Sequence, residues 1–437
     1  MSCGSHGPIG DAEFASLLDP LGPFEPRPRL AVAVSGGADS LALCLLARRW
    51  AVARGGEALA VVCDHGLRDG SGDEATLVAS GLRSRGIAAT VLKLAVPSGP
   101  GVAKRARAAR YAALERECAA AGLLHLLLGH HAADQAETVA MRLLHGSGQV
   151  GLSGMAAVAE GRSVRLLRPL LTASPARLRD TLGAFGADWL EDPTNGDARH
   201  LRPRLRELRR DRLGAGPVVA AALAAATLRG HRRHVRDAET VQSLAASVRL
   251  HPAGYALISR DLIEGDVAEA FAAVIRAVSG AFRLPPLVQA AAWLANPRAA
   301  TLGGTQIQPA GRLCRDGWLV VRELAAVEPP VAATFDLWWD RRFRLRGAVA
   351  GVCGALGEQA SEYRHLTPLP LIVLQTLPAI RVASRVVGIP HLNVGNSAVS
   401  SVFSPAAPLS GVFWPPGSNH STAGMHKAAR PPILTPA

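Results

Sequence analysis

The sequence has few lysines, no paired cysteines and no long apolar run. Its six cysteines, at positions 3, 44, 63, 118, 314 and 353, form no Cys-x-x-Cys pair, so neither structural zinc nor an iron–sulfur cluster is indicated. Such scatter is typical of a reducing compartment. No apolar run reaches the roughly 18–20 residues that cross a membrane. No basic segment followed by an apolar one opens the chain, so we expect no secretory signal and a cytoplasmic protein.

The positive charge is carried almost entirely by arginine. The 437 residues have a net charge of +13, and lysine occurs only at positions 93, 104 and 427. Arginine binds phosphates and stacks on bases, which favours RNA as a partner. A GC-rich genome also raises arginine, alanine and glycine together, and all three are abundant here, so the charge alone is a weak argument.

Short apolar runs alternate with helical stretches from Arg29 onward. This order predicts an α/β fold, with a doubly wound, mostly parallel sheet and helices on both faces. Binding sites in such folds lie at the carboxyl ends of the strands. The expected strands are Leu30–Val34, Ala58–Cys63, Ala89–Leu94, Leu123–Leu128 and Val164–Leu167, and the expected helices are Leu41–Arg54, Asp73–Arg85, Val102–Ala121, Ala133–His145 and Pro175–Phe185.

Changes in composition predict five segments. We expect an N-terminal extension over 1–28, with a short amphipathic piece at Asp11–Leu18, and the α/β domain over 29–212. A helical domain follows over 213–325, with expected helices at Pro217–Leu228, Ala238–Val248 and Val267–Ser279. It ends in a small β unit around Trp318–Val321. A small β-rich module is expected over 332–413, and a Gly/Ser/Pro/His-rich disordered tail over 414–437.

The first expected strand runs directly into a glycine-rich turn that opens a helix. Glycines without Cβ atoms let backbone N–H groups approach an anion, and the helix N-terminus adds its dipole. A carboxylate beside phosphates needs a bridging cation, so Asp39 suggests Mg²⁺. A plain glycine turn with Ser40 as N-cap is the alternative. The expected nucleotide-binding residues are Ser35, Gly36, Gly37, Ala38, Asp39 and Ser40.

Two further groups of polar residues accompany this loop. Asp64 and His65 follow the second strand, where they could contact a phosphate or the nucleobase, or form an ordinary polar turn. Arg107 and Arg110 are three residues apart on an expected helix and so share a face. They could neutralise triphosphate or RNA, although a solvated helix face is the common meaning of such a run.

The longest polar motif runs from Leu128 to Met155. It leaves a strand and enters a helix, with His131, Asp134 and Glu137 stacked on one face. Two acids and a histidine at this place are costly to bury without a cationic partner. They could hold an ammonium group, a bridging cation or a developing charge; a helix-capping cluster is the alternative. A zinc site is disfavoured because no third ligand has a clear spacing.

Arginines recur after an acidic turn over 191–197. Arg202, Arg204 and Arg206 are two residues apart, so they diverge on a helix but align on an extended chain. Either arrangement could serve phosphate contacts.

The turn Ser35–Ser40 resembles the Ser-Gly-Gly-x-Asp-Ser loop of the N-type ATP pyrophosphatases, or PP-loop enzymes. Together with Asp64–Arg68, Arg107-x-x-Arg110-Tyr111, Gly129–Met155, Arg168–Leu171 and Asp192–Arg206, it is similar to the tRNA(Ile)-lysidine synthetase family over about residues 29–210. One departure is Arg202-Pro203, where the family often has Arg-Asn.

The resemblance implies an ATP-dependent C–N ligase that forms AMP and pyrophosphate. ATP would adenylate O2 of the wobble cytidine in tRNA(Ile) with a CAU anticodon, and the ε-amine of free L-lysine would then displace AMP to leave lysidine. It also implies that Asp39 holds Mg²⁺, that Arg107 or Arg110 balances triphosphate charge, and that Asp134 and Glu137 position lysine. His131 completes the expected catalytic set. The region 213–325 would bind tRNA, no membrane is involved, and a homodimer is left open.

Three other functions agree less well with these residues. A PP-loop tRNA sulfurtransferase generally needs paired cysteines, which are absent here. A small-molecule synthetase that uses ammonia carries a glutaminase domain or partner, and no such domain is evident. A non-catalytic RNA-binding relative is disfavoured by the intact Asp39, Asp134 and Glu137.

Overall fold

The computed structural model describes residues 7–64, 66, 70–94, 99, 101–147, 149–161, 163–190, 204–205, 211, 216–265, 267–347, 350–395, 399–407 and 412–413. These residues form two compact units. The first contains the described residues through Val235 together with strand β19, and the second contains the other described residues from Arg236 onward. The predicted boundaries at 28, 212 and 325 differ from this division and stay a prediction, and the predicted tail over 414–437 lies outside the described residues.

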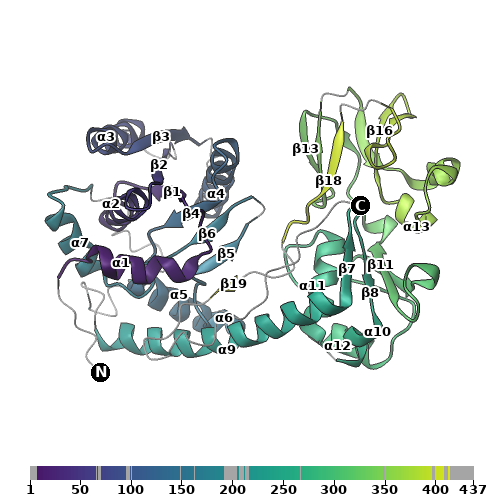
Figure 1. Cartoon of the computed structure of the whole chain (residues 1–437), viewed down its shortest axis with the longest axis horizontal. Helices are drawn as coiled ribbons and strands as arrows, with labels where there is room; N and C mark the ends of the chain where they lie inside the picture. The colour runs from purple at the N-terminus through teal and green to yellow at the C-terminus, as the bar shows by residue number, and fades with distance from the viewer. Residues whose placement is uncertain are drawn as a thin grey trace. The chain divides into compact units, whose positions relative to one another are not determined.

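A twisted seven-stranded sheet forms the centre of the first unit (Figure 1). Its order is β19-β5-β6-β4-β1-β2-β3, and the pairs from β6 to β3 are all parallel. Strands β5 and β19 extend it in antiparallel fashion. The strands are β1 (Arg29–Val34), β2 (Glu57–Asp64), β3 (Ala88–Lys93), β4 (His125–Leu128), β5 (Val158–Glu160), β6 (Arg165–Leu167) and β19 (Val412–Phe413).

Helices cover both faces of this sheet, as predicted. Alternate residues of β1 point to opposite faces: Leu30 and Val32 pack in the large core with helices α1, α2, α3 and α7, whereas Ala31 packs with Leu114 and Cys118 of α4. The helices are α1 (Asp11–Leu18), η1 (Asp19–Leu21), α2 (Ala38–Val52), α3 (Ser71–Ser84), α4 (Val102–Ala120), α5 (Ala132–Leu144), α6 (Gln149–Leu152) and α7 (Pro175–Ala184).

Most predicted elements of this unit agree with the structure to within three residues. Helix α2 begins at Ala38 rather than Leu41, which places Asp39 and Ser40 in its first turn. Strand β5 was not predicted, because three residues with one buried side chain carry no periodic signal. Residues 9–21 are part of the core, where Phe14 and Leu18 are buried.

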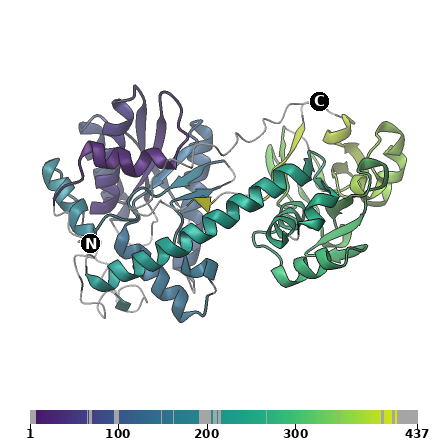
Figure 2. The same cartoon turned by 60° about the horizontal axis from the view of Figure 1, so that its bottom comes forward.

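Helix α9 (Pro217–Ser247) is one continuous helix where two shorter ones were predicted (Figures 1 and 2). Its first turns belong to the first unit, where Val219 packs on Ala132 and Ala136 of α5. Its last turns belong to the second unit, where Leu244 is buried in the core around α11. Among the described residues, no helix is both long and apolar enough to span a membrane.

The second unit contains a five-stranded antiparallel sheet that was predicted only in part. The small β unit near Trp318–Val321 is confirmed, but β7 and β8 also join it, so the helical prediction for 213–325 is incomplete. The sheet order is β7-β8-β11-β10-β9. The elements are β7 (Val248–His251), β8 (Tyr255–Ile258), α10 (Arg260–Glu264), α11 (Ala268–Ser279), α12 (Leu287–Ala295), β9 (Ala300–Leu302), β10 (Thr305–Pro309), η3 (Gly311–Leu313), β11 (Trp318–Arg322) and η4 (Leu324–Ala326).

Both faces of β8 are buried, which explains why it lacks an alternating pattern. Ala256 and Ile258 pack against α11 and α12, whereas Tyr255 and Leu257 pack against the β-rich part that follows. That part has two small sheets, β12-β15-β16-β17 and β13-β14-β18. Its elements are β12 (Val331–Ala332), β13 (Asp336–Trp339), β14 (Phe343–Arg346), β15 (Val352–Ala355), η5 (Gly357–Leu366), α13 (Leu371–Leu374), β16 (Pro378–Val382), β17 (Arg385–Gly388), η6 (Pro390–Leu392) and β18 (Ser400–Phe403).

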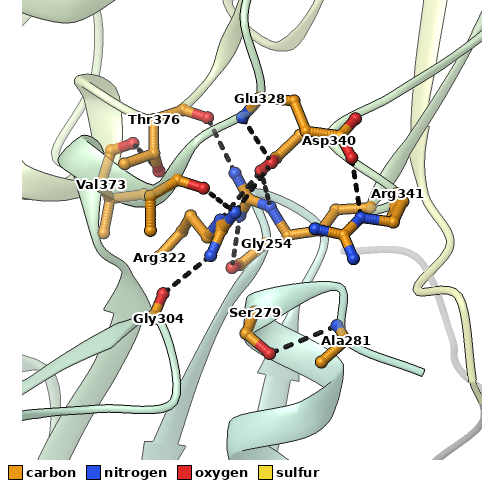
Figure 3. A network of polar contacts seen from close by, with 12 residues as sticks. Gly254, Ser279, Ala281, Gly304, Arg322, Glu328, Asp340, Arg341, Val373 and Thr376 are labelled. Atoms are coloured by element: carbon orange, nitrogen blue, oxygen red, sulfur yellow. Dashed lines mark hydrogen bonds and ion pairs between the residues drawn. The ribbon is translucent and has the colours of Figure 1, made fainter. Parts of the chain in front are cut away.

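A buried ion cluster joins the sheet of β11 to the turn between β13 and β14 (Figure 3). The Asp340 carboxylate accepts hydrogen bonds from Arg322 at 3.1 Å and from Arg342 at 2.5 Å. It also accepts one from the backbone N–H of Glu328. Both guanidinium groups additionally donate to backbone carbonyls, Arg322 to Gly304 and Arg342 to Thr376. The cluster contains two cations, Arg322 and Arg342, and one anion, Asp340. Burial lowers the pKa of Arg342 to about 10, although the charge of Asp340 opposes this shift.

Candidate active site

The turn after β1 has the geometry of an open backbone cradle. Gly36 has a φ of +84°, and a Cβ atom there would lie 2.8 Å from Cγ2 of Val78, so only glycine fits. Gly37 precedes α2 as its N-cap and has no side chain to bond the first-turn N–H groups. Gly37 therefore leaves the N-terminal N–H groups of α2 without a side-chain cap. Anion binding at a helix N-terminus requires N–H groups that are free in this way.

The two serines of the turn bind to the turn itself. The Ser40 hydroxyl accepts a hydrogen bond from the Ser35 backbone N–H at 3.1 Å and donates to the Gly37 carbonyl at 3.0 Å. The two serine hydroxyls are 3.2 Å apart. Ser40 therefore shapes the loop, and the backbone N–H groups are the better phosphate donors. The binding roles of Ser35, Gly36, Gly37, Ala38, Asp39 and Ser40 stay predictions.

The carboxylate of Asp39 lies beside the imidazole of His131. Strands β1 and β4 are parallel neighbours, so the turn after β1 and the loop after β4 meet at one edge of the sheet. A Cβ atom on Gly129 would be 3.1 Å from Cα of Ser40, so glycine allows this close approach. Nε2 of His131 then lies 3.4 Å from Oδ2 of Asp39.

His131 and Asp134 form a reciprocal cap at the start of α5. The Asp134 backbone N–H donates to Nδ1 of His131 at 3.3 Å, and the His131 backbone N–H donates to Oδ2 of Asp134 at 3.2 Å. The second contact of Nε2, to Oδ2 of Asp134, is 3.6 Å. The capping alternative considered from the sequence is therefore real, and it coexists with the contact to Asp39.

The acids around His131 raise the pKa of its imidazole. Burial alone would lower the pKa of His131, but its hydrogen bond to Asp39 and the negative charges of Asp134, Asp39 and Glu137 together raise it. Glu137 is 1% exposed, one helical turn beyond Asp134 on α5. The structure thus brings four predicted catalytic residues together: Asp39, His131, Asp134 and Glu137.

Asp39 fits the needs of a magnesium ion bound with phosphates. Mg²⁺ is usually held by one or two carboxylates and completed by phosphate oxygens and water. The side chain of Asp39 is 38% exposed, and its ion pair with His131 uses Oδ2. Within the described ranges, no group of three or more His, Cys, Asp or Glu residues could hold a metal ion alone. The Mg²⁺ assignment to Asp39 stays a prediction.

Arg107 and Arg110 lie on α4 around the ring of Tyr111. The guanidinium carbons of Arg107 and Arg110 are 5.0 and 5.7 Å from its centroid, and Nη2 of Arg107 donates to the Tyr111 hydroxyl at 3.3 Å. Cys63 lies near the end of β2, and burial raises the pKa of its thiol to about 11. The positive charge of Arg110 is close enough to this thiol to act against that rise. The two arginines therefore lie near the carboxyl edge of the sheet.

Asp64 stabilises its own loop. Its Oδ1 accepts hydrogen bonds from the Gly66 N–H at 2.9 Å and from the Ser71 hydroxyl at 2.7 Å. A contact of Asp64 with nucleotide stays a prediction. His65, Arg202, Pro203 and Arg206 lie outside the described residues.

The sequence indicated no role for Gln135 and Arg142. In the structure, both side chains form hydrogen bonds with the backbone at the end of α6 and in the loop that follows. The Gln135 amide makes two hydrogen bonds with the Met155 backbone, at 2.6 and 2.8 Å. Nη1 of Arg142 donates to the carbonyls of Gly151 and Gly154 at 2.7 and 2.6 Å. Both residues lie in the motif read from the sequence, but only the fold shows what they bind.

The turn with Asp39 at a helix N-terminus, at the edge of a parallel sheet, defines the chain's first part as a PP-loop domain. The family model described as "PP-loop domain" matches residues 11–211. More narrowly, the chain belongs to the tRNA(Ile)-lysidine synthase family. It is 32% identical over 410 residues to a tRNA(Ile)-lysidine synthase of Ruegeria pomeroyi, an alignment that covers 89% of this chain and 94% of the relative.

Other relatives match mainly the first part of the chain. A tRNA(Ile)-lysidine synthase of Bradyrhizobium sp. is 45% identical over 206 residues, which cover 46% of this chain and 57% of the relative. The aligned part thus spans little more than half the length of such relatives. Among solved structures, the U34-tRNA thiolase NcsA of Methanococcus maripaludis has a TM-score of 0.41 and 16% identity, covering 51% of this chain and 78% of that one.

Proposed function

We propose that this protein joins free lysine to C2 of the wobble cytidine of tRNA(Ile) with a CAU anticodon, with ATP as the energy source. The observation that carries the proposal is the contact between Asp39 of the nucleotide loop and His131 of the acidic cluster. It supports the proposal because a turn that bound the nucleotide and acids that bound the amine would then lie at one sheet edge. Family membership supports lysine as the amine donor and tRNA as the acceptor.

The first step activates the pyrimidine. O2 of the cytidine attacks the α-phosphorus of ATP, the α–β phosphoanhydride bond breaks, and pyrophosphate leaves. The N–H groups of the turn after β1 would bear the charge of the leaving pyrophosphate. Bound Mg²⁺, held by Asp39, would screen the phosphates. His131 would stay between Asp39 and Asp134 and keep the two carboxylates from repelling one another.

The second step transfers the amine. The ε-amine of lysine attacks C2, the C2–O bond breaks, AMP leaves, and the amine gives up its excess protons. The carboxylates of Asp134 and Glu137 would hold the ammonium form on arrival, and one of them would accept a proton as the amine becomes nucleophilic. Arg107 or Arg110 would balance negative charge on the nucleotide.

The proposal of tRNA as the substrate extends to the rest of the chain. The helical region over 213–325 would bind tRNA, and the β-rich module would also contact the tRNA. A tRNA-modifying enzyme of this kind would act in the cytoplasm. A homodimer stays a prediction.

A sulfurtransferase is the weaker alternative because the pKa values of four of the five described cysteines are raised. Burial raises the pKa of Cys44, Cys118 and Cys353 to about 12, so their thiolates are disfavoured at neutral pH. None of the five described cysteines is in a disulfide.

The decisive test offers the purified protein ATP, labelled lysine and two tRNA transcripts that differ only at the wobble base. We expect label to enter the CAU transcript and not the GAU transcript, with one AMP and one pyrophosphate formed per lysine. Release of ADP and orthophosphate, or equal labelling of both transcripts, would overturn the proposal.

A further inference from the structure

Arg168 is a half-buried cation at the edge of the sheet, and the expected machinery does not use it. It directly follows β6, which pairs with β4, so it lies at the same edge as the loop that leads to His131. Its backbone N–H donates to the Ala157 carbonyl at 2.8 Å, and its Nη1 donates to the Ala156 carbonyl at 2.8 Å. The guanidinium is therefore held in place from one side by the backbone before β5.

The guanidinium of Arg168 also interacts with the hydroxyl of Tyr111. Burial lowers the pKa of Arg168, the nearby Tyr111 hydroxyl opposes that shift through charge and hydrogen bonding, and the positive charge of Arg107 adds to it. The same hydroxyl accepts a hydrogen bond from Nη2 of Arg107. The Tyr111 hydroxyl thus interacts with two guanidinium groups from distant parts of the chain.

No acid neutralises these cations in the part of the chain that the structure describes. Arg107, Arg110 and Arg168 form no ion pair there, and no carboxylate contributes to the pKa of Arg168. Nε of Arg168 is buried and donates to no acceptor among the described residues. Like charges gathered in this way repel unless an anion lies between them.

We propose that Arg107 and Arg168, joined through the hydroxyl of Tyr111, form a phosphate-binding site separate from the turn after β1. A guanidinium presents a planar fork of donors that matches phosphate oxygens, and two forks fixed by one hydroxyl are pre-organised for that geometry. Arg168 binds the anion, and Tyr111 positions both arginines. The phosphate belongs either to ATP or to the RNA backbone beside the reacting nucleotide, so the site rests on the proposed function for its ligand.

The test compares three variants with a matched control. Arg168→Gln and Arg107→Gln each remove one cation, and Tyr111→Phe removes only the bridging hydroxyl. Arg116→Gln is the control because Arg116 is an exposed cation on the same helix, outside the cluster. For each protein, we would measure the dissociation constants of α,β-methylene-ATP and of the tRNA transcript, the latter over a series of salt concentrations.

We expect Arg168→Gln and Arg107→Gln to weaken the same ligand by about tenfold or more, and Arg116→Gln to leave both constants within about twofold. Tyr111→Phe should weaken that ligand by about threefold. A loss confined to α,β-methylene-ATP assigns the site to the nucleotide. A loss confined to tRNA, with the slope of log K against log salt reduced by roughly 0.7 to 0.9, assigns it to the RNA backbone.

Unchanged affinity for both ligands in Arg168→Gln would overturn the proposal. Should that variant fail to fold, the double-mutant cycle between Tyr111→Phe and Arg107→Gln still decides, and additive effects would overturn the joint site. Wild-type protein that binds ATP and tRNA but transfers no lysine would refute the proposed function, while these binding measurements would still test the phosphate site.

Discussion

Nε2 of His131 lies 3.4 Å from Oδ2 of Asp39, although the two residues are 92 positions apart in the chain. The contact joins the turn after β1 to the start of α5, because their strands are parallel neighbours. It puts an imidazole between the carboxylate expected to face the nucleotide and the acids expected to face the amine. A substitution of Asp39 should therefore alter the electrostatics around Asp134 and Glu137, and a substitution of either acid should alter those around Asp39.

Asp39→Ala should abolish adenylation while tRNA binding survives. Because Asp39 is proposed to hold the bridging cation, we expect exchange of labelled pyrophosphate into ATP, with tRNA present, to fall by about 10²–10³-fold. Asp73→Ala, an exposed acid in the first turn of α3, is the matched control and should retain exchange. Undiminished exchange in Asp39→Ala would remove Asp39 from the mechanism.

Asp134→Asn and Glu137→Gln should impair the use of lysine more than adenylation. Both changes keep the size of the side chain but lose the charge that would hold an ammonium group. We expect the KM for lysine to rise by about tenfold or more, with pyrophosphate exchange within about twofold of the wild type. An equal loss of both steps would contradict the assigned role.

The pKa of His131 should fall when Asp39 is neutralised. The folded protein raises this pKa, so the stability gained from the charged imidazole is complete below the pKa of the unfolded chain and is lost as pH rises through the folded value. In Asp39→Asn, the His131 signal in nitrogen-detected histidine spectra, assigned by comparison with His131→Gln, should titrate at lower pH than in the wild type. A titration at unchanged pH would show that Asp39 does not set this charge.

Asp340→Asn should destabilise the second unit strongly. It leaves the guanidinium groups of Arg322 and Arg342 buried without their shared anion, which we expect to cost about 3–5 kcal/mol in the free energy of unfolding. The control is Asp336→Asn, which breaks a partly exposed pair with Arg344 and should cost about 0.2–1 kcal/mol. Urea unfolding of both variants measures the difference, and similar costs would contradict the role of the buried cluster.

Sequence patterns predicted the local structure best at positions where few residue types could take the required conformation. The glycines of the turn after β1 and the spacing of His131, Asp134 and Glu137 predicted a strand, a turn and a helix that the structure contains. The pattern failed for β8, because that strand is buried on both faces and shows no alternation. It also divided α9 in two, since its arginine-rich middle breaks the apolar period.

The sequence by itself determined the PP-loop turn, the helical face that carries the acidic cluster, and the parallel order of sheet and helix, because each depends on residues close together in the chain. Only the tertiary structure decided that Asp39 meets His131, that Ser40 turns back into its own loop, and that Arg107 and Arg168 share the hydroxyl of Tyr111. Those contacts depend on which strands pair, and strand pairing is set by the packing of whole faces against one another rather than by any single motif.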